Sequence, residues 1–151
     1  MAAGTFTLFS ANKDDLRMQD LPGAVVNLSL HTSTYSPDGG AAGNSLFADA
    51  TNELATGGGY TAGGQALTTD ALTAITNGWK YSSDNPTWTA SAGGIPAWRY
   101  GVLYVVGTLW GKTNPLIGYF VADTTPADAP ATASPNPLTI TVPASGWFDL
   151  V

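Results

Sequence analysis

One stretch of the chain, residues 97–106, constrains the fold more than any other. It reads Ala-Trp-Arg-Tyr-Gly-Val-Leu-Tyr-Val-Val, and at a strand's period of two both alternating sets of side chains are largely apolar. The run is rich in aromatic and β-branched residues and lies between Pro96 and Gly107, which favours a strand over a buried helix. We predict a central strand covered on one face by an opposing sheet and on the other by loops, a terminus or another subunit.

Other stretches supply neighbours for this strand. Residues 24–31 alternate between an apolar set and a second set that ends in Ser29 and His31, so we predict a strand with one face on the core and His31 on the surface. Asn77-Gly78 is typical of a two-residue turn and predicts a hairpin of residues 71–76 and 79–81. Further strands are expected at residues 87–89, 116–121, 138–142 and 147–151.

Helical signals are few. Asn12 is suited to cap a short helix that runs through Gln19 and ends at Pro22-Gly23, and residues 46–54 are expected to form one brief helical turn. The chain is therefore predicted to be all-β: a single-domain β-sandwich or jelly roll with about seven or eight strands and one short N-terminal helix.

Two segments differ from the rest of this domain. Residues 1–9 contain Phe6, Leu8 and Phe9, and they either add a strand to the domain's own sheet or dock on a neighbour; we predict an N-terminal arm. Residues 10–151 then form the single β-sandwich domain. Within it, residues 123–137 make a Pro-rich loop that is either disordered or an interaction element.

The charge of the chain limits its partners. Charged residues make up 11% of the sequence, against about a quarter in a typical soluble domain, which suits a surface covered by other subunits and also an extracellular β-domain. The net charge of −6 provides no basic stripe for phosphates, so we expect no direct contact with nucleic acid. The N-terminus lacks a signal-peptide pattern and no run reaches about 18 apolar residues, so we expect cytoplasmic synthesis and no membrane contact.

No motif in the chain predicts an enzyme. Gly57-x-Gly59 is part of a dinucleotide-binding fingerprint, but further glycines follow where its helix should begin. The chain has no cysteine and one histidine, which excludes Cys-based and two-His metal sites, and its carboxylates lack the spacing of a calcium loop. Five tryptophans offer a sugar-binding face, although burial at a core edge or an oligomer interface is their commoner role. We expect no catalytic residue, no metal and no cofactor.

Three segments resemble one group of proteins in the same order along the chain. They are an alternating strand followed by Tyr-Ser-Pro-Asp within residues 25–38, Glu53 followed by Gly-Tyr-x-x-Gly-Gly-x-x-Leu at residues 59–67, and Ala-x-Arg-Tyr-x-x-x-Tyr at residues 97–104 followed by Pro-Leu-Ile-Gly at residues 115–118. Together they resemble small virion structural proteins of tailed bacteriophages, a head decoration or cement-like family. Two departures are Trp98, inserted between Ala97 and Arg99, and the length of the loop at residues 123–137.

The resemblance implies a non-enzymatic role in the virion. We expect a capsid decoration or cement protein that stabilises the head by binding at capsid-subunit junctions on the capsid surface, with the major capsid protein and its own copies, as a homotrimer, for partners. The interface residues expected are Phe6, Leu8, Phe9, Trp98 and Arg99, and Arg99 needs a carboxylate partner within the domain or across a subunit contact. The alternative is a tail-associated or fibre/spike module that binds a host receptor or glycan through exposed tryptophans.

Overall fold

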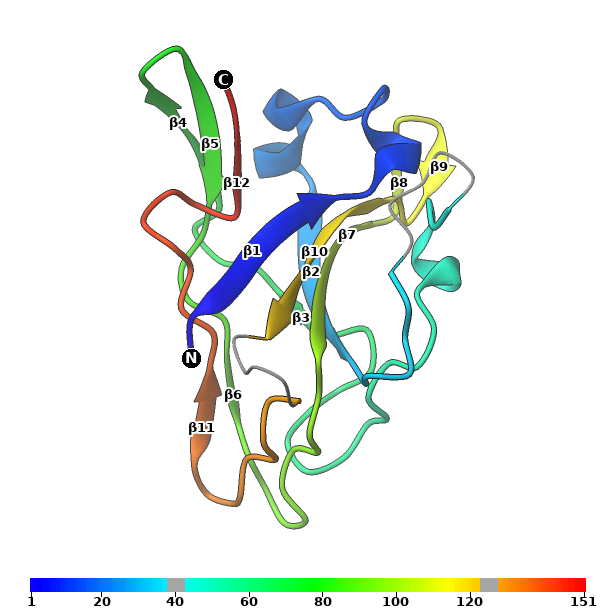
Figure 1. Ribbon diagram of the computed structural model, residues 1–151, viewed down its shortest axis with the longest axis vertical. Coiled ribbons are helices and arrows are strands. Elements are labelled where there is room, and N and C mark those ends of the chain that lie inside the picture. Colours follow the sequence, from blue (N-terminus) through cyan, green and yellow to red (C-terminus); the bar gives the residue numbers. More distant parts are fainter. Residues whose placement is uncertain (38–42, 123–127) are drawn as a thin grey trace.

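A computed structural model describes residues 1–37, 43–122 and 128–151, and it is all-β (Figure 1). Its strands are β1 (Ala3–Leu8), β2 (Val25–His31), β3 (Gln65–Ala66), β4 (Ala71–Ile75), β5 (Gly78–Ser82), β6 (Thr87–Thr89), β7 (Tyr100–Val106), β8 (Thr108–Leu109), β9 (Lys112–Thr113), β10 (Leu116–Ala122), β11 (Pro137–Thr139) and β12 (Phe148–Leu150). These strands outnumber the seven or eight expected, partly because β3, β8 and β9 have only two residues each.

The strands form several antiparallel sheets. The largest has five strands in the order β1-β10-β7-β2-β3, a second has the order β12-β5-β4, and β11-β6 and β8-β9 are two-stranded. Side chains from the five-stranded sheet and from β5, β6, β11 and β12 share one hydrophobic core, which gives the chain a sandwich-like architecture. No helix in the described ranges has the length and apolar character needed to span a membrane.

Strand β7 is the central strand that the sequence predicts. It lies between β10 and β2, and its pairing with β2 is regular from Val106 opposite Val25 to Tyr100 opposite His31. One of its faces meets the main core through Leu103 and Val105. The other face belongs to a second cluster, so both faces are covered as expected.

The covering of that second face comes from the chain itself. Phe47, in the 3₁₀ turn η3 (Phe47–Asp49), stacks on Tyr104 with ring centroids 3.8 Å apart, and Tyr35 and Ala50 pack in the same cluster. Phe9 joins them from the N-terminal segment. Loops and a terminus therefore cover this face of β7, and the brief helical turn expected within residues 46–54 is present as η3.

Residues 1–9 do not form a free arm. Strand β1 pairs with β10, with Phe6 opposite Phe120 and Leu8 opposite Gly118, and Phe9 is only 1% exposed. The prediction of an arm is therefore corrected to the alternative, an added strand in the domain's own sheet. The physical reason is burial, because Phe6 and Leu8 pack against the core that the sheet already forms.

Two glycines allow aromatic rings to cross between the strands of this sheet. A Cβ on Gly101 of β7 would lie 2.3 Å from the ring of Phe120 in β10, and a Cβ on Gly118 of β10 would lie 2.3 Å from the ring of Phe6 in β1. Each ring thus occupies the space that a side chain on the neighbouring strand would need. Two glycine–aromatic pairs thus lie next to each other across β7, β10 and β1.

The predicted N-terminal helix is replaced by two 3₁₀ turns, η1 (Ser10–Asn12) and η2 (Met18–Gly23). Asn12 is not a cap. Its buried amide donates hydrogen bonds to the carbonyl oxygens of Ser45 and Leu116, both at 2.7 Å, and its Oδ1 accepts one from Lys112 Nζ at 2.7 Å. These tertiary bonds use the side chain that a helix cap would need, and they tie the N-terminal segment to β9 and β10.

The hairpin around Asn77-Gly78 is confirmed, with its corner shifted by one residue. Ile75 pairs with Gly78, so Thr76 and Asn77 form the corner, and Asn77 has a φ of 64°. Gly78 is needed for another reason. A Cβ there would lie 2.0 Å from the carbonyl oxygen of Leu150 in β12.

The C-terminal part of the second face of residues 24–31 is buried, which corrects the expectation of a surface His31. His31 and Ser29 are both 0% exposed, because the covering segment around η3 packs over this side of β2. His31 Nδ1 donates to the carbonyl oxygen of Thr51 at 2.8 Å, and Ser29 Oγ lies 3.0 Å from Nε2. Both ring nitrogens thus have partners, as burial requires.

The Pro-rich loop was expected at residues 123–137, and its first part, residues 123–127, lies outside the described residues. The part from residue 128 onward packs along residues 95–98, because Trp98 and Ala129 exchange two backbone hydrogen bonds and Ile95 bridges to Thr132. Trp98 consequently leaves the alternation of β7 and enters the main core, on the opposite side from Tyr100.

Candidate functional site

The three-stranded sheet carries one apolar face from the core out into solvent. In β5, Tyr81 pairs with Leu72 and Phe148, while Trp79, two residues away, pairs with Ala74 and Leu150. Residues two apart point to the same face of a strand, so Tyr81 and Trp79 share a face. Tyr81 is fully buried, whereas Trp79 is 51% exposed and Leu150 is 45% exposed. Trp79 and Leu150 therefore leave the outer part of this apolar face uncovered. The hairpin of β4 and β5 that carries Trp79 lies at one end of the molecule (Figure 1).

A groove of about 510 Å³ lies between this face and η2, and we call it the hairpin groove. Its lining residues are Arg17, Met18, Gln19, Leu72, Trp79 and Leu150. The apolar side chains include a tryptophan, and the two polar residues are hydrogen-bond donors. None of the six is a carboxylate, a histidine or a nucleophile. This composition is typical of a docking surface and not of a catalytic centre.

The five residues expected at an interface do not form one surface. Trp98 and Phe9 are buried, and Phe6 and Leu8 pack against the main core. Arg99 lies 3.6 Å from Asp128, both partly exposed, so a carboxylate within the domain is one partner of its guanidinium. Four of the five residues thus contribute to packing.

The tryptophans differ in exposure. Trp88, Trp98 and Trp147 are buried, and the partly buried Trp110 donates from Nε1 to Asp20 Oδ2 at 3.0 Å. Trp79 is the one tryptophan among the exposed large hydrophobic residues. A sugar-binding face made of several tryptophans is therefore absent from the described residues, and Trp79 alone remains for that role.

Glu53, Tyr60, Gly63 and Tyr104, which belong to the segments that carry the resemblance, meet at the glycine-rich loop. The carboxylate of Glu53 accepts hydrogen bonds from the Tyr60 hydroxyl at 2.7 Å and from the Gly63 N–H at 2.5 Å. The Tyr60 hydroxyl also accepts from the Leu30 N–H, and the Tyr104 hydroxyl donates to the Gly63 carbonyl oxygen at 2.8 Å. Burial, with Glu53 beside it, raises the pKa of Tyr60, so the hydroxyl stays protonated and keeps donating. This network fastens the loop to β2 and β7.

The close approach of the loop explains its glycines. A Cβ on Gly59 would lie 2.2 Å from the Thr89 carbonyl oxygen, and a Cβ on Gly64 would lie 2.0 Å from the Leu28 carbonyl oxygen. Gly57 and Tyr60 exchange two backbone hydrogen bonds in a tight turn, and no helix follows them. The glycines thus serve packing, and the partial dinucleotide fingerprint has no phosphate-binding helix.

Ser29 and His31 are the nearest approach to a catalytic pair in the described ranges. Burial lowers the pKa of His31, which favours the neutral ring that accepts from Ser29 Oγ and donates to Thr51. Both residues are 0% exposed, so a substrate has no route to them. Elsewhere in the described ranges, no three His, Asp or Glu side chains gather as a metal site would require.

Sequence reasoning missed the hairpin groove. The signal that was available is the spacing of Trp79 and Tyr81, which places both on one face of a predicted strand. Whether the second sheet extends past the core depends on the packing of segments far apart in the chain.

Comparisons of this chain with family models, with curated proteins and with solved structures found no match.

Proposed function

We propose that this chain is a non-enzymatic structural protein of a tailed-bacteriophage virion, a decoration or cement protein on the capsid surface. The observation that carries a docking role is the uncovered apolar face at the hairpin groove, where Trp79 and Leu150 are about half exposed. The virion context rests on the resemblance of residues 25–38, 53–67 and 97–118 to phage virion proteins. The partner of the groove in this proposal is the major capsid protein at a junction between its subunits.

The groove replaces the N-terminal arm as the proposed contact. Strand β1 packs Phe6 and Leu8 against the domain's own core, so residues 1–9 are not a free arm that could lie across a neighbour. Trp79 has the properties of an interface anchor, because a large aromatic side chain at the centre of an apolar patch gains most from being covered. A homotrimer, in which copies meet around a capsid junction, belongs to the same proposal.

The test uses bare, expanded capsids and the purified full chain. The chain is expected to bind the capsids and raise their melting temperature, and Trp79→Ala is expected to weaken binding by about 2 kcal/mol, roughly 30-fold. Val25→Ala is the matched control, since Val25 is equally exposed but lies on β2, outside the groove. Absence of capsid binding would overturn the decoration role, and equal binding by Trp79→Ala would overturn the role of the groove.

A second candidate function rests on the same tryptophan. Trp79 offers a ring face for stacking on a sugar, and Arg17 and Gln19 beside it offer hydrogen-bond donors. The protein would then be a tail-associated or fibre/spike module that binds a host glycan or receptor. Binding to a glycan array that is lost in Trp79→Ala, together with no binding to capsids, would favour this function over decoration.

A further inference from the structure

Strand β1 lies at an edge of the five-stranded sheet and is paired on one side only. The Phe9 N–H donates to the Ile117 carbonyl oxygen at 3.2 Å, so Phe9 and, by antiparallel alternation, Thr7 turn their main-chain groups toward β10. The N–H and C=O groups of Phe6 and Leu8 therefore face the outer edge. Within the described ranges, no backbone hydrogen bond joins residues 4–8 to any segment other than β10.

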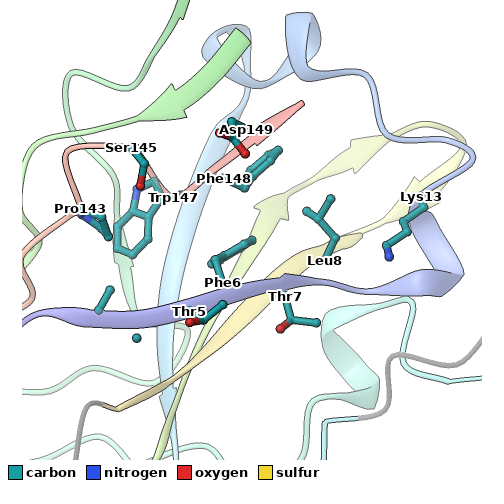
Figure 2. Close-up of a pocket in the computed structure, with 13 residues that line it drawn as sticks. Thr5, Phe6, Thr7, Leu8, Lys13, Pro143, Ser145, Trp147, Phe148 and Asp149 are labelled. Atoms are coloured by element: carbon teal, nitrogen blue, oxygen red, sulfur yellow. The ribbon is translucent and has the colours of Figure 1, made fainter. Parts of the chain in front are cut away.

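A second groove, of about 650 Å³, runs beside this edge, and we call it the edge groove (Figure 2). Its near wall is β1 and its far wall is the C-terminal segment of residues 143–149. One end is closed, because Ala3 N–H donates to the Thr141 carbonyl oxygen and Thr141 N–H donates to that of Met1. Figure 2 shows Phe6 and Leu8 pointing from β1 toward the side of Phe148. The ring of Phe6 stacks on that of Phe148, with centroids 5.5 Å apart.

The edge carries little of the protection that exposed edge strands usually have. Residues 3–8, Ala-Gly-Thr-Phe-Thr-Leu, contain no charge and no proline. A bulge interrupts the pairing between Ala3 and Phe6, but the three residues from Phe6 to Leu8 pair regularly with residues 120–118. The outward groups of Phe6 and Leu8 are thus presented in the geometry that a further strand needs.

We propose that the edge groove accepts an extended segment of a partner polypeptide, which adds to the sheet beside β1. The outward N–H and C=O groups of β1 carry partial charges of opposite sign. The main chain of an added extended segment complements them by hydrogen bonding. Alternate side chains of the added segment lie in the groove against Phe6 and Phe148. The proposal concerns a surface separate from the hairpin groove and does not depend on a virion location.

The packing of β1 favours a flexible segment of another protein over a second folded copy of this chain that pairs through its own β1. In a folded copy, Phe6 and Leu8 of β1 already pack in its own core. Such a strand presents Thr5 and Thr7, which are exposed and too short to fill the groove. A segment without a fold of its own has all its side chains available, and a terminal arm is the simplest source.

The first measurement is amide hydrogen exchange of the free full-length protein. Phe6 and Leu8 are expected to exchange faster than Thr7 and Phe9, because only the latter pair donates to β10. Equal protection of all four amides would overturn the assignment of the outer edge. Protection of Phe6 and Leu8 that rises with protein concentration would show that a second copy covers the edge, and would overturn the choice of partner.

The second measurement uses a synthetic peptide that alternates valine and threonine between flanking lysines. Saturating peptide is expected to slow exchange at Phe6 and Leu8 by about tenfold or more. The same peptide, N-methylated at every valine and threonine so that neither edge can donate, is expected to lose this effect. Equal protection by both peptides, or by neither, would overturn main-chain pairing at this edge.

Ser145→Trp provides a variant that obstructs the groove without touching the core, since Ser145 is exposed on its far wall. It is expected to abolish peptide binding. Ser33→Trp, the same change at an exposed position outside the groove, is the control and is expected to bind normally. Equal peptide binding by both variants, with both folded as judged by circular dichroism, would place the binding site elsewhere and overturn the proposal.

Discussion

At the scale of single residues, His31 links folding to pH. Burial holds its pKa below the ordinary value of 6.5, so the unfolded chain takes up the proton first as the pH falls. The free energy of unfolding is therefore expected to decrease below pH 6.5, by up to about 1.4 kcal/mol per pH unit, until the lowered pKa is reached. Above pH 6.5 this contribution to stability is fully present.

The measurement for His31 is urea unfolding between about pH 7.5 and about pH 5.5, a window above the range where carboxylates titrate. His31→Phe keeps an aromatic ring beside Tyr35 and removes the titrating group, although it leaves Ser29 without its partner on the ring. This variant is expected to be less stable at neutral pH and to have a flatter pH dependence. A pH dependence as steep as in the parent protein would contradict the role of His31.

Glu53 gives a second prediction at this scale. Glu53→Ala removes the acceptor for the Tyr60 hydroxyl and the Gly63 N–H, and it is expected to cost about 2–3 kcal/mol because both donors are left partly buried without it. Thermal unfolding measures the loss. In the background of Tyr60→Phe the cost of Glu53→Ala is expected to be smaller, and equal costs in the two backgrounds would show that the hydroxyl and the carboxylate are not coupled.

At the scale of elements, β1 is expected to be essential for the fold. Deletion of residues 1–9 removes an edge strand together with the buried ring of Phe9, whose loss alone is worth about 3–5 kcal/mol by analogy with Phe→Ala substitutions. The truncated chain is expected to lose its cooperative thermal transition and its near-ultraviolet circular dichroism. Thr5→Ser, a mild change at an exposed β1 position, is the control. A stable, cooperative truncated chain would restore the interpretation of residues 1–9 as an arm.

Elements with a local pattern could be predicted from the sequence, and elements defined by distant contacts could not. Alternation identified β2, an apolar run rich in aromatic and β-branched residues identified β7, and Asn77-Gly78 identified the hairpin to within one residue. The burial of His31, the use of Asn12 as a tertiary tether and the return of residues 1–9 to the sheet each depend on segments far away in the chain. The hairpin groove was missed for the same reason, because the exposure of Trp79 and Leu150 depends on how the rest of the chain packs.

At the scale of the whole molecule, a main core shared between sheets predicts one unfolding transition. The main cluster joins residues from β2, β5, β7, β10 and β12, and the second cluster lies on the other face of the same strand β7, so the sheets cannot unfold independently. Tryptophan fluorescence and far-ultraviolet circular dichroism are expected to report the same midpoint in urea. Trp147 and Trp88 lie in the layer opposite β7, so separate midpoints for the two probes would indicate two domains and contradict a single one.

The two glycine–aromatic pairs across β7, β10 and β1 limit which substitutions this sequence can accept as it diverges. Gly101 can acquire a side chain only if residue 120 becomes smaller, because a Cβ there would meet only the ring of Phe120. At Gly118 a Cβ would meet the backbone oxygen of Thr7 as well as the ring of Phe6. Substitutions at residues 101 and 120 should therefore occur together, whereas residue 118 should remain glycine. Covariation of residues 101 and 120 in an alignment of descendants would record the pairing of β7 with β10 without any coordinates.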